Sequence, residues 1–416
     1  GREMTAEDVV YTFDRVLGKT EAGDIGALGS SSSYFGGIES VEALDPYTVQ
    51  FTLAEPNAAF LNNLTSNYGA IVDKDVIEAN GDLMRADGGT GPFQLGEWLP
   101  DNYVELTKFA DYWEADRVML DGITYYLIGD ESARLAALRT GEIDIANLSS
   151  TNVTAAEEEE NLAVLGYQTN DYIAMGCNLS TPALQDKNVR QAMSYALDRQ
   201  AIINIVYNGQ AAVSSMVPPA MGHWSLDVST MDLYQFNLDK AKELMEAAGY
   251  SEDNRLTLKL AAGLMDSLRQ AAVVIQQQLA QIYIDVEITN LESGEYVDIW
   301  GKMSTPEAGF DLMVVNDGAG TDPNRAISFF FGSTASANVF GFSNERVDEL
   351  CALGIATTDE AQREEYYNEA QEICIDDCTK LCIASPMKYF VTASYVEGFA
   401  PSAADASNFR DTNLAR

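Results

Sequence analysis

The sequence predicts an α/β protein built from more than one domain. The chain has 416 residues, more than one hydrophobic core usually organises, so we expect at least two domains. In the second half, segments that alternate like strands are separated by single segments with helical periodicity, at residues 256–261, 267–282, 284–289, 293–303 and 310–315. Strands joined through single helices usually pair in parallel through right-handed crossovers. This part is therefore predicted to form an α/β domain.

The charge balance of the chain is strongly acidic. Asp and Glu number 64 against 25 Lys and Arg, which gives a formal net charge of -39. A surface of this sign repels phosphate backbones and anionic lipid headgroups, so we expect no nucleic-acid partner. The acidic residues are spread along the chain, which is typical of a solvated surface. No apolar run reaches the roughly 18 residues of a membrane-spanning helix, so none is predicted.

The N-terminal part predicts a helix followed by two short strands. Thr5 or Asp8 is positioned to cap a helix with an apolar face. The Gly- and Ser-rich residues 18–33 are expected to form a loop. Residues 38–51 predict two short strands around a turn, since the second alternates apolar and polar side chains.

The middle of the chain predicts a strand that leads into two helices. The strand covers residues 172–178, and Asp186 is positioned to cap the first helix. The second helix begins at Asp198 and ends at Gly209. Two polar helices are expected later, at residues 344–355 and 359–378.

Several stretches carry motifs in a fixed order. They are GREMTAEDVVYTFDRV (1–16), GGTGPFQLGEW (88–98), KFADYW (108–113), DESARLAALRTGEIDIA (130–146), VRQA and YALDR (189–199), FNLDKAKELMEAAGY (236–250) and ASPMKYFVTASYVEGF (384–399). In this order and spacing the motifs resemble the extracytoplasmic solute-binding proteins of peptide-type ABC importers (family 5, which includes oligopeptide-, dipeptide- and nickel-binding members). One departure is that Phe109 and Ala110 stand where the family usually has Asn-Pro.

The resemblance implies a two-lobed, periplasmic-binding-protein-like (type II) α/β fold with an extra small subdomain in the first lobe. It assigns residues 1–87 to that subdomain, 88–177 to the main part of lobe one, 178–385 to lobe two and 386–416 to a return into lobe one. Two crossings, near residues 176–178 and 383–387, are expected to join the lobes. Because the chain begins inside a motif, the resemblance implies that first-lobe strands and any signal peptide or lipoprotein cysteine precede it.

The resemblance also implies a function. It predicts the solute-binding component of an ABC importer, a cell-surface lipoprotein or periplasmic monomer that captures short peptides between its lobes and delivers them to a membrane permease. Any membrane attachment is expected only through a lipid anchor. One alternative is that the same fold binds a non-peptide solute such as an oligosaccharide, opine or metal chelate. Alternatives from other classes are a secreted carboxylate-dependent hydrolase and an extracellular adhesion or chaperone module.

An inventory of reactive residues favours binding over catalysis. The single histidine, His223, lies in a loop beside Trp224, and the chain has no GxSxG, HExxH, Walker or GxGxxG motif. We therefore predict no enzyme activity, no catalytic residues and no cofactor.

Five cysteines form an odd number, and four of them cluster late in the chain. Cys374, Cys378 and Cys382 recur at spacing four and could line one helical face. Buried free thiols are the favoured interpretation, with one disulfide or a metal site as alternatives. No close CxxC pair is present, so no metal site is predicted.

The candidate ligand site is the loop at residues 316–333, which follows the last predicted strand. Ligands of α/β sheets bind beyond the carboxyl ends of the strands. In the resembled family this strand and loop pair with an extended peptide, and a loop aspartate holds the peptide's α-ammonium. Here Ala319 or Gly320 stands near that position, and Asp317 and Asp322 are the nearest carboxylates. Asp317 is equally compatible with ligand and turn roles, whereas for Asp322 a turn role before Pro323 is favoured.

The remaining site candidates surround this loop. Asn316 and Gly318 flank Asp317, and Arg325 could bind a ligand carboxylate through its fork or form an internal ion pair. Tyr296 and Trp224 could stack on a ligand. By the same resemblance, Asn178 and Arg199 match positions with structural roles and are not expected to bind ligand.

Overall fold

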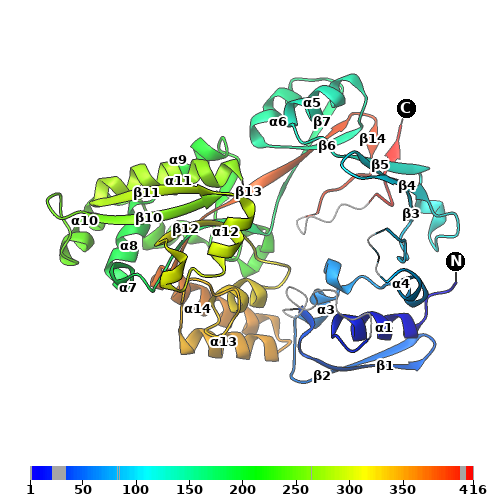
Figure 1. The fold of residues 1–416 in the computed structure, drawn as a ribbon, viewed down its shortest axis with the longest axis horizontal. Coiled ribbons are helices and arrows are strands. Elements are labelled where there is room, and N and C mark those ends of the chain that lie inside the picture. The colour runs from blue at the N-terminus through cyan, green and yellow to red at the C-terminus, as the bar shows by residue number, and fades with distance from the viewer. Residues whose placement is uncertain are drawn as a thin grey trace. The chain divides into compact units, whose positions relative to one another are not determined.

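The structure is a computed structural model that describes residues 2–20, 34–81, 83, 85–263, 265–402 and 409–415 (Figure 1). It divides into two compact units. Unit 1 contains Gly1–Tyr167 and Tyr389–Arg416, and unit 2 contains Gln168–Lys388. Most of the predicted loop at residues 18–33 lies outside the described residues.

Unit 2 is organised around a mixed sheet. Its strands are β8 (Asp171–Cys177), β9 (Ala211–Val213), β10 (Leu256–Gly263), β11 (Ile284–Leu291), β12 (Leu312–Gly318) and the first part of β13 (Lys380–Ala393). The order is β11-β10-β12-β8-β13, and β9 pairs with β13. β10 pairs in parallel with β11 and β12, as the alternation of strands and helices predicts. β8 is antiparallel to both β12 and β13, which makes the sheet mixed.

Helices cover both faces of this sheet. They are α7 (Pro182–Gln185), α8 (Lys187–Ala196), α9 (Arg199–Val206), α10 (Leu238–Ala247), α11 (Asp266–Leu279), α12 (Ser293–Trp300), α13 (Glu345–Ala356) and α14 (Glu360–Asp377). The two predicted N-caps are confirmed. The Asp186 carboxylate accepts from the Asn188 N–H, and the Asp198 carboxylate accepts from the Ala201 N–H, both at 2.9 Å. These contacts satisfy N–H groups that the first helical turn leaves unpaired.

The alternation of side chains along β8 separates two hydrophobic cores. Ile173 and Met175 belong to the core formed with α8, α9, α10 and α11, which lie along one face (Figure 1). Tyr172 and Ala174 belong to the core on the other face, with α12, α13 and α14. Gly176 has no side chain because a Cβ there would lie 2.1 Å from the Phe340 ring. Both faces of β8 are therefore buried, which explains its nearly continuous apolar sequence.

Unit 1 contains smaller sheets and helices. Its elements are α1 (Ala6–Val16), β1 (Ile38–Asp45), β2 (Thr48–Leu53), α3 (Phe60–Asn63), α4 (Lys74–Asn80), β3 (Phe93–Leu99), β4 (Tyr103–Lys108), β5 (Gly122–Tyr126), α5 (Glu131–Thr140), β6 (Ile145–Leu148), α6 (Ser150–Glu157), β7 (Leu162–Gln168), β14 (Val396–Glu397) and β15 (Asn413–Leu414). β1 and β2 form the predicted antiparallel pair, and β3, β4 and β5 form a second sheet. The last part of β13 pairs with β6.

The limits of the two units differ from the boundaries expected from the motifs. The structure divides after residues 167 and 388, whereas we expected boundaries after 177 and 385. β8 falls wholly in unit 2 because it pairs with β12 along its full length. A separate small subdomain at residues 1–87 stays a prediction.

The cysteines do not lie on one helical face. Cys374 is in α14, Cys378 follows the end of that helix with a left-handed φ of 60°, and Cys382 is in β13. These three and the other two, Cys177 and Cys351, are buried free thiols. Burial raises the pKa of Cys378 and of Cys382 to about 12, so both stay protonated and unreactive at neutral pH.

The described part of the chain contains neither a candidate membrane span nor a candidate metal cluster. No helix there is long and apolar enough to cross a membrane. Within the same residues, no group of three or more His, Cys, Asp or Glu side chains is arranged to hold a metal ion.

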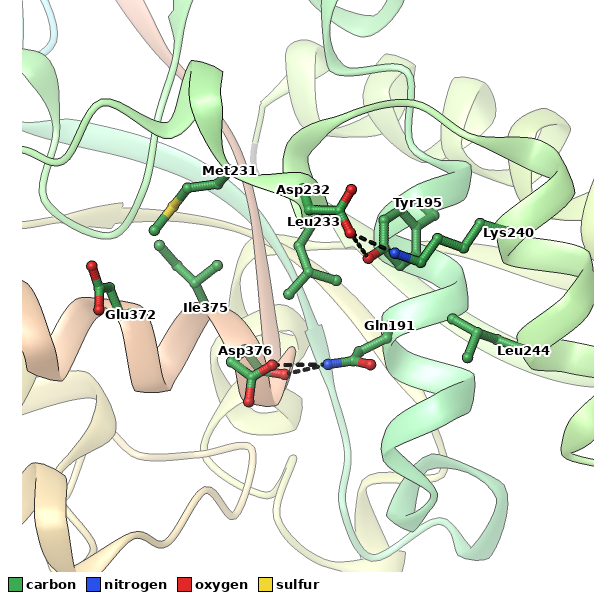
Figure 2. Close-up of a pocket in the computed structure, with 10 residues that line it drawn as sticks. All are labelled: Gln191, Tyr195, Met231, Asp232, Leu233, Lys240, Leu244, Glu372, Ile375 and Asp376. Carbon is green, nitrogen blue, oxygen red and sulfur yellow. Dashed lines mark hydrogen bonds and ion pairs between the residues drawn. The ribbon is translucent and has the colours of Figure 1, made fainter.

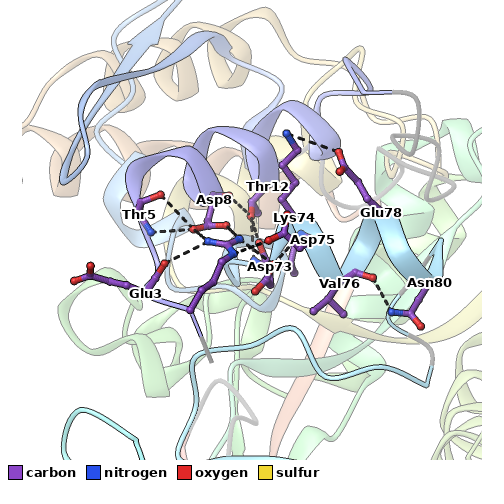
Figure 3. Close-up of polar contacts among 12 residues, drawn as sticks. Glu3, Thr5, Asp8, Thr12, Asp73, Lys74, Asp75, Val76, Glu78 and Asn80 are labelled. Atoms are coloured by element: carbon purple, nitrogen blue, oxygen red, sulfur yellow. Dashed lines mark hydrogen bonds and ion pairs between the residues drawn. The ribbon is translucent and has the colours of Figure 1, made fainter.

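The start of α1 is held by an ion-pair cluster around Arg2. Figure 3 shows its acidic partners Asp8, Asp73 and Asp75 close together. Thr5 is the N-cap, and its N–H donates to the carboxylate of Asp8 at 2.9 Å. Arg2 donates to the same carboxylate and to those of Asp73, at 2.8 Å, and Asp75, at 2.9 Å. Asp73 and Asp75 belong to the start of α4, so the cluster joins the two helices.

We expect the Asp8 contact to make unit 1 less stable in acid. The hydrogen bonds from Arg2 lower the pKa of Asp8 to about 2. A lowered folded-state pKa stabilises the fold above the unfolded value of about 3.9 and loses this effect as the pH falls toward about 2. Because the Arg2 side chain is 38% exposed and solvent screens the pair, we expect the contact to stabilise the folded state by only about 1–2 kcal/mol.

Urea midpoints of the wild type and Asp8→Asn, measured from pH 5 to 2.5, test this expectation. The gap between the two proteins should be largest at pH 5 and should close toward the acid end. Asp75→Asn is the matched control, since Asp75 also pairs with Arg2 but is 71% exposed, and it should change the midpoint little. A gap that stays constant across this range would contradict the assignment.

Candidate ligand-binding site

One edge of β12 is left open at its carboxyl end. β8 pairs with all of β12 from Leu312 to Gly318, but β10 pairs only with Leu312 and Met313. From residue 314 onward, the edge of β12 opposite β8 pairs with no strand in the described chain. Asn316 and Gly318 are also exposed in this stretch. This end of the strand therefore offers backbone groups and exposed positions together.

The backbone of Asn316 faces this open edge. The Ala319 N–H donates to the Asn170 carbonyl at 2.8 Å, and the Cys177 N–H donates to the Thr379 carbonyl on the β13 side of β8, also at 2.8 Å. In an antiparallel ladder the residues that bond to the neighbouring strand alternate. Even-numbered residues of β12, including Asn316, therefore direct their N–H and C=O groups away from β8.

Asp317 points into the core and forms a buried ion pair. Its carboxylate accepts from the Lys380 ammonium at 2.6 Å, and the two side chains are 7% and 2% exposed. The Lys380 ammonium lies 4.3 Å from the centre of the Phe330 ring and within 5.8 Å of the Phe331, Phe340 and Tyr172 rings. A buried charge requires a partner, and here each charge supplies it for the other.

Asp322 forms a second buried ion pair and also shapes the turn. Both of its carboxylate oxygens accept from Arg363 of α14, at 2.8 and 2.9 Å. One of them also accepts from the Asn324 N–H at 3.0 Å, which is the turn role predicted before Pro323. The Asp322 side chain is 2% exposed.

Arg325 holds the loop against the end of β12. Its Nη1 donates to the Gly318 carbonyl at 3.0 Å, and its guanidinium lies 4.3 Å from the Phe329 ring centre. Gly320 has a φ of 77°, and a Cβ there would lie 2.7 Å from the Arg325 Cδ. Glycine is favoured at position 320 because the backbone there is left-handed and because a side chain would collide with Arg325.

The two aromatic candidates lie in the core beneath the loop. Tyr296 is 4% exposed and donates its hydroxyl to the Val314 carbonyl at 2.8 Å. Burial raises the pKa of Tyr296, so it stays a neutral donor. Trp224 is half-buried, with its ring 5.2 Å from the Arg363 guanidinium and edge-on to Tyr367. His223 beside it pairs with Glu360 at 3.0 Å, in an exposed position.

The structure thus brings Asn316, Asp317, Gly318, Asp322 and Arg325 together, with Tyr296 and Trp224 packed behind them. Sequence reasoning missed Lys380 and Arg363, which neutralise the two aspartates. No local pattern marks these cations, because each lies dozens of residues away from its partner in the chain.

Asn178 and Arg199 have the structural roles expected of them. The Asn178 amide donates to the carbonyls of Thr305 and Phe310, at 3.2 and 3.0 Å. Buried Arg199 donates to the Cys382 carbonyl at 2.9 Å, and its guanidinium lies 4.1 Å from the Tyr234 ring centre. Both side chains are therefore engaged with backbone carbonyls of the chain itself.

A cavity of about 500 Å³ lies elsewhere in unit 2 and shares no residue with this loop (Figure 2). Two of its acids are paired internally. Asp232 accepts from Tyr195 at 2.6 Å and from Lys240 at 2.5 Å, and Asp376 accepts from Gln191 at 3.0 Å. Asp232 and Asp376 are thus engaged by side chains of the chain itself, and Glu372 is the third acid that lines the cavity.

Comparison with known proteins decides the family. The family described as bacterial extracellular solute-binding proteins, family 5 (middle), matches residues 1–338. The chain belongs to this family. Its predicted family and two-lobed α/β fold class are confirmed.

Other family 5 proteins are similar over most of the chain. The oligopeptide-binding protein AppA of Bacillus subtilis is 28% identical over 96% of this chain and 75% of its own length. The glutathione-binding protein GsiB of Salmonella choleraesuis is 30% identical over 81% of this chain and 66% of its own length. This chain therefore spans between about two thirds and three quarters of these relatives.

Solved structures of family 5 proteins match the fold. The Bacillus subtilis AppA complex with a nonapeptide has a TM-score of 0.80 at 27% identity, covering 100% of this chain and 84% of that one. DppA of Helicobacter pylori in complex with the peptide STSA has a TM-score of 0.82 at 26% identity, covering 100% and 82%. NikA of Staphylococcus aureus, in complex with nickel and histidine, has a TM-score of 0.79 at 21% identity over 100% and 85%, and shows the fold alone. These relatives are binding proteins rather than enzymes.

Proposed function

We propose that this family 5 protein captures short peptides outside the cytoplasm and hands them to the permease of an ABC importer. The observation that carries the peptide assignment is the open edge of β12 at residues 314–318. An extended peptide adds to such an edge through main-chain hydrogen bonds, and Asn316 directs its N–H and C=O there. The peptide complexes of AppA and DppA support this assignment.

The proposed ligand contacts follow from this placement. Asn316 supplies its N–H and C=O to the backbone edge, and Gly318 supplies only its N–H, because its carbonyl already accepts from Arg325. Arg325 and Asp322 fix the loop that bounds this edge. Tyr296 and Trp224 support the loop from the core. Backbone pairing is indifferent to side chains, so we expect the protein to accept many peptide sequences of similar length.

A screen of melting temperatures tests the ligand class. Peptides of two to nine residues are compared with oligosaccharides, an opine and a nickel–histidine chelate. A ligand at a hundred times its Kd stabilises the bound state by about 2.7 kcal/mol, which raises Tm measurably. If the chelate, opine or oligosaccharide raises Tm and no peptide does, the protein still belongs to family 5 but its ligand is not a peptide.

We expect Asn316→Pro to weaken peptide binding about tenfold or more, because it removes an N–H at the open edge without breaking a bond to β8. Asn316→Ala is the matched control. It keeps the backbone N–H and should bind peptide as the wild type does. Calorimetric titration of both variants measures the difference. Equal losses in both would show that the side chain, not the strand edge, contacts the peptide.

The partner and the anchoring are proposals of the same kind. We infer a permease partner from the family, and a reconstituted importer that fails to respond to the peptide-loaded protein would contradict it. A periplasmic protein and a cell-surface lipoprotein are distinguished by cell fractionation of the native, full-length product.

A further inference from the structure

The loop beyond β12 carries few charged groups. Between residues 316 and 333 the charged side chains are Asp317, Asp322 and Arg325. Arg325 is a cation and cannot bind an ammonium group. Any recognition of a positively charged peptide end by this loop must therefore use one of the two aspartates.

Asp317 is occupied by a cation that is fixed in place. Lys380 is the first residue of β13, and its backbone pairs with Gly176 of β8. Its ammonium is enclosed by the aromatic rings of Tyr172, Phe330, Phe331 and Phe340, as described above. A ligand ammonium could replace Lys380 only by leaving that charge buried without a carboxylate, which is strongly unfavourable.

Asp322 is occupied in the same way. Arg363 holds both of its carboxylate oxygens, and the Arg363 Nε donates to the Gly354 carbonyl at 3.0 Å. The guanidinium is thus fixed from two sides. The two side chains are only 8% and 2% exposed, so no free carboxylate face remains.

The acid of the adjacent strand also has a cation partner, in a more exposed pair whose side chains are 28% and 40% exposed. Asp171 of β8 lies opposite Gly318 in the ladder, at the same end of the sheet. Its carboxylate pairs with the Lys388 ammonium at 3.2 Å. The two loop aspartates and Asp171 therefore each already have a cation of this chain as partner.

We propose that this site binds peptides without recognising their α-ammonium group, so that its ligands include peptides with a blocked amino end. The inference rests on the proposed function and specifies the ligand class of the same site. An ammonium group that leaves water needs a carboxylate, and the loop has none to offer. Binding energy then comes from the strand edge, which is the same for free and blocked peptides.

Competition between two peptide libraries tests the inference. One random library of four to nine residues carries free amino ends, and the other is N-acetylated. Both are offered in equal amounts to the protein, and the bound pool is read by mass spectrometry. We expect free and acetylated peptides within about threefold of each other. Enrichment of free peptides by about tenfold or more would overturn the inference.

Two variants connect the outcome to the ion pair. Asp317→Asn with Lys380→Met removes both charges and should leave the ratio of the two libraries unchanged. Lys380→Met alone leaves the Asp317 carboxylate without its cation, but the carboxylate stays buried in the core, so the ratio of the two libraries should again be unchanged. A ratio that favours free amines in the wild type and falls to one in the double variant would show that Asp317 does bind the ammonium.

The binding results distinguish a failure of this inference from a failure of the proposed peptide-binding function. If free peptides bind and acetylated ones do not, the protein is a peptide-binding protein and only the present inference falls. If neither library is bound while another solute raises Tm, both fall together.

Discussion

Lys380→Met is expected to lower the free energy of unfolding of unit 2 by about 3–5 kcal/mol. The substitution leaves the Asp317 carboxylate buried, at 7% exposure, without the ammonium that pairs with it. It also removes an ammonium that four aromatic rings surround. Urea denaturation followed by tryptophan fluorescence measures the loss.

Two controls separate the ion pair from a simple change of size. Asp317→Asn with Lys380→Met removes both charges, and a buried pair replaced by neutral groups often costs little, so most of the stability should return. Lys302→Met breaks an exposed pair with Asp298 and should cost less than about 1 kcal/mol. A double variant as unstable as the single one would show that packing, not charge, explains the loss.

Arg363→Met should lower the free energy of unfolding by a similar amount, about 3–5 kcal/mol. The substitution removes the cation that pairs with the buried Asp322 carboxylate in the described structure. It also leaves the Gly354 carbonyl without its donor. Since the Trp224 ring lies 5.2 Å from the guanidinium, the fluorescence of the folded protein should change as well. A Trp224→Phe background shows how much of that change comes from this ring.

The neighbouring helix offers a matched control for this prediction. Arg346 of α13 also forms a two-pronged pair, with Glu369 at 2.8 and 2.9 Å, but both side chains are more than 40% exposed. Arg346→Met should therefore cost less than about 1 kcal/mol. Similar losses for the two arginines would contradict the view that burial makes the Asp322 pair important.

The local sequence determined the secondary structure of unit 2 closely. Alternation in residues 256–261 and 284–289, with helical periodicity between them, predicted β10, α11 and β11, which pair in parallel. Asp186 and Asp198 were identifiable as caps because a cap and the N–H it accepts from are two or three residues apart. Such signals span only a few residues, so they are readable without the fold.

Motif order likewise determined the family, since ordered motifs run through nearly the whole chain. The placement of the candidate loop at the carboxyl end of β12 followed from the strand pattern alone. The surplus of acidic residues was visible from composition, but composition does not say which acids meet a cation.

Only the tertiary structure decided what the site aspartates do. Asp317 meets Lys380 and Asp322 meets Arg363 across separations of 63 and 41 residues, through β13 and α14 packed against the sheet. The open edge of β12 is also invisible in sequence, because it depends on where β10 stops pairing. In both cases the deciding contact joins distant segments, and pairing of buried charges or backbone groups is a property of the packed fold rather than of local sequence.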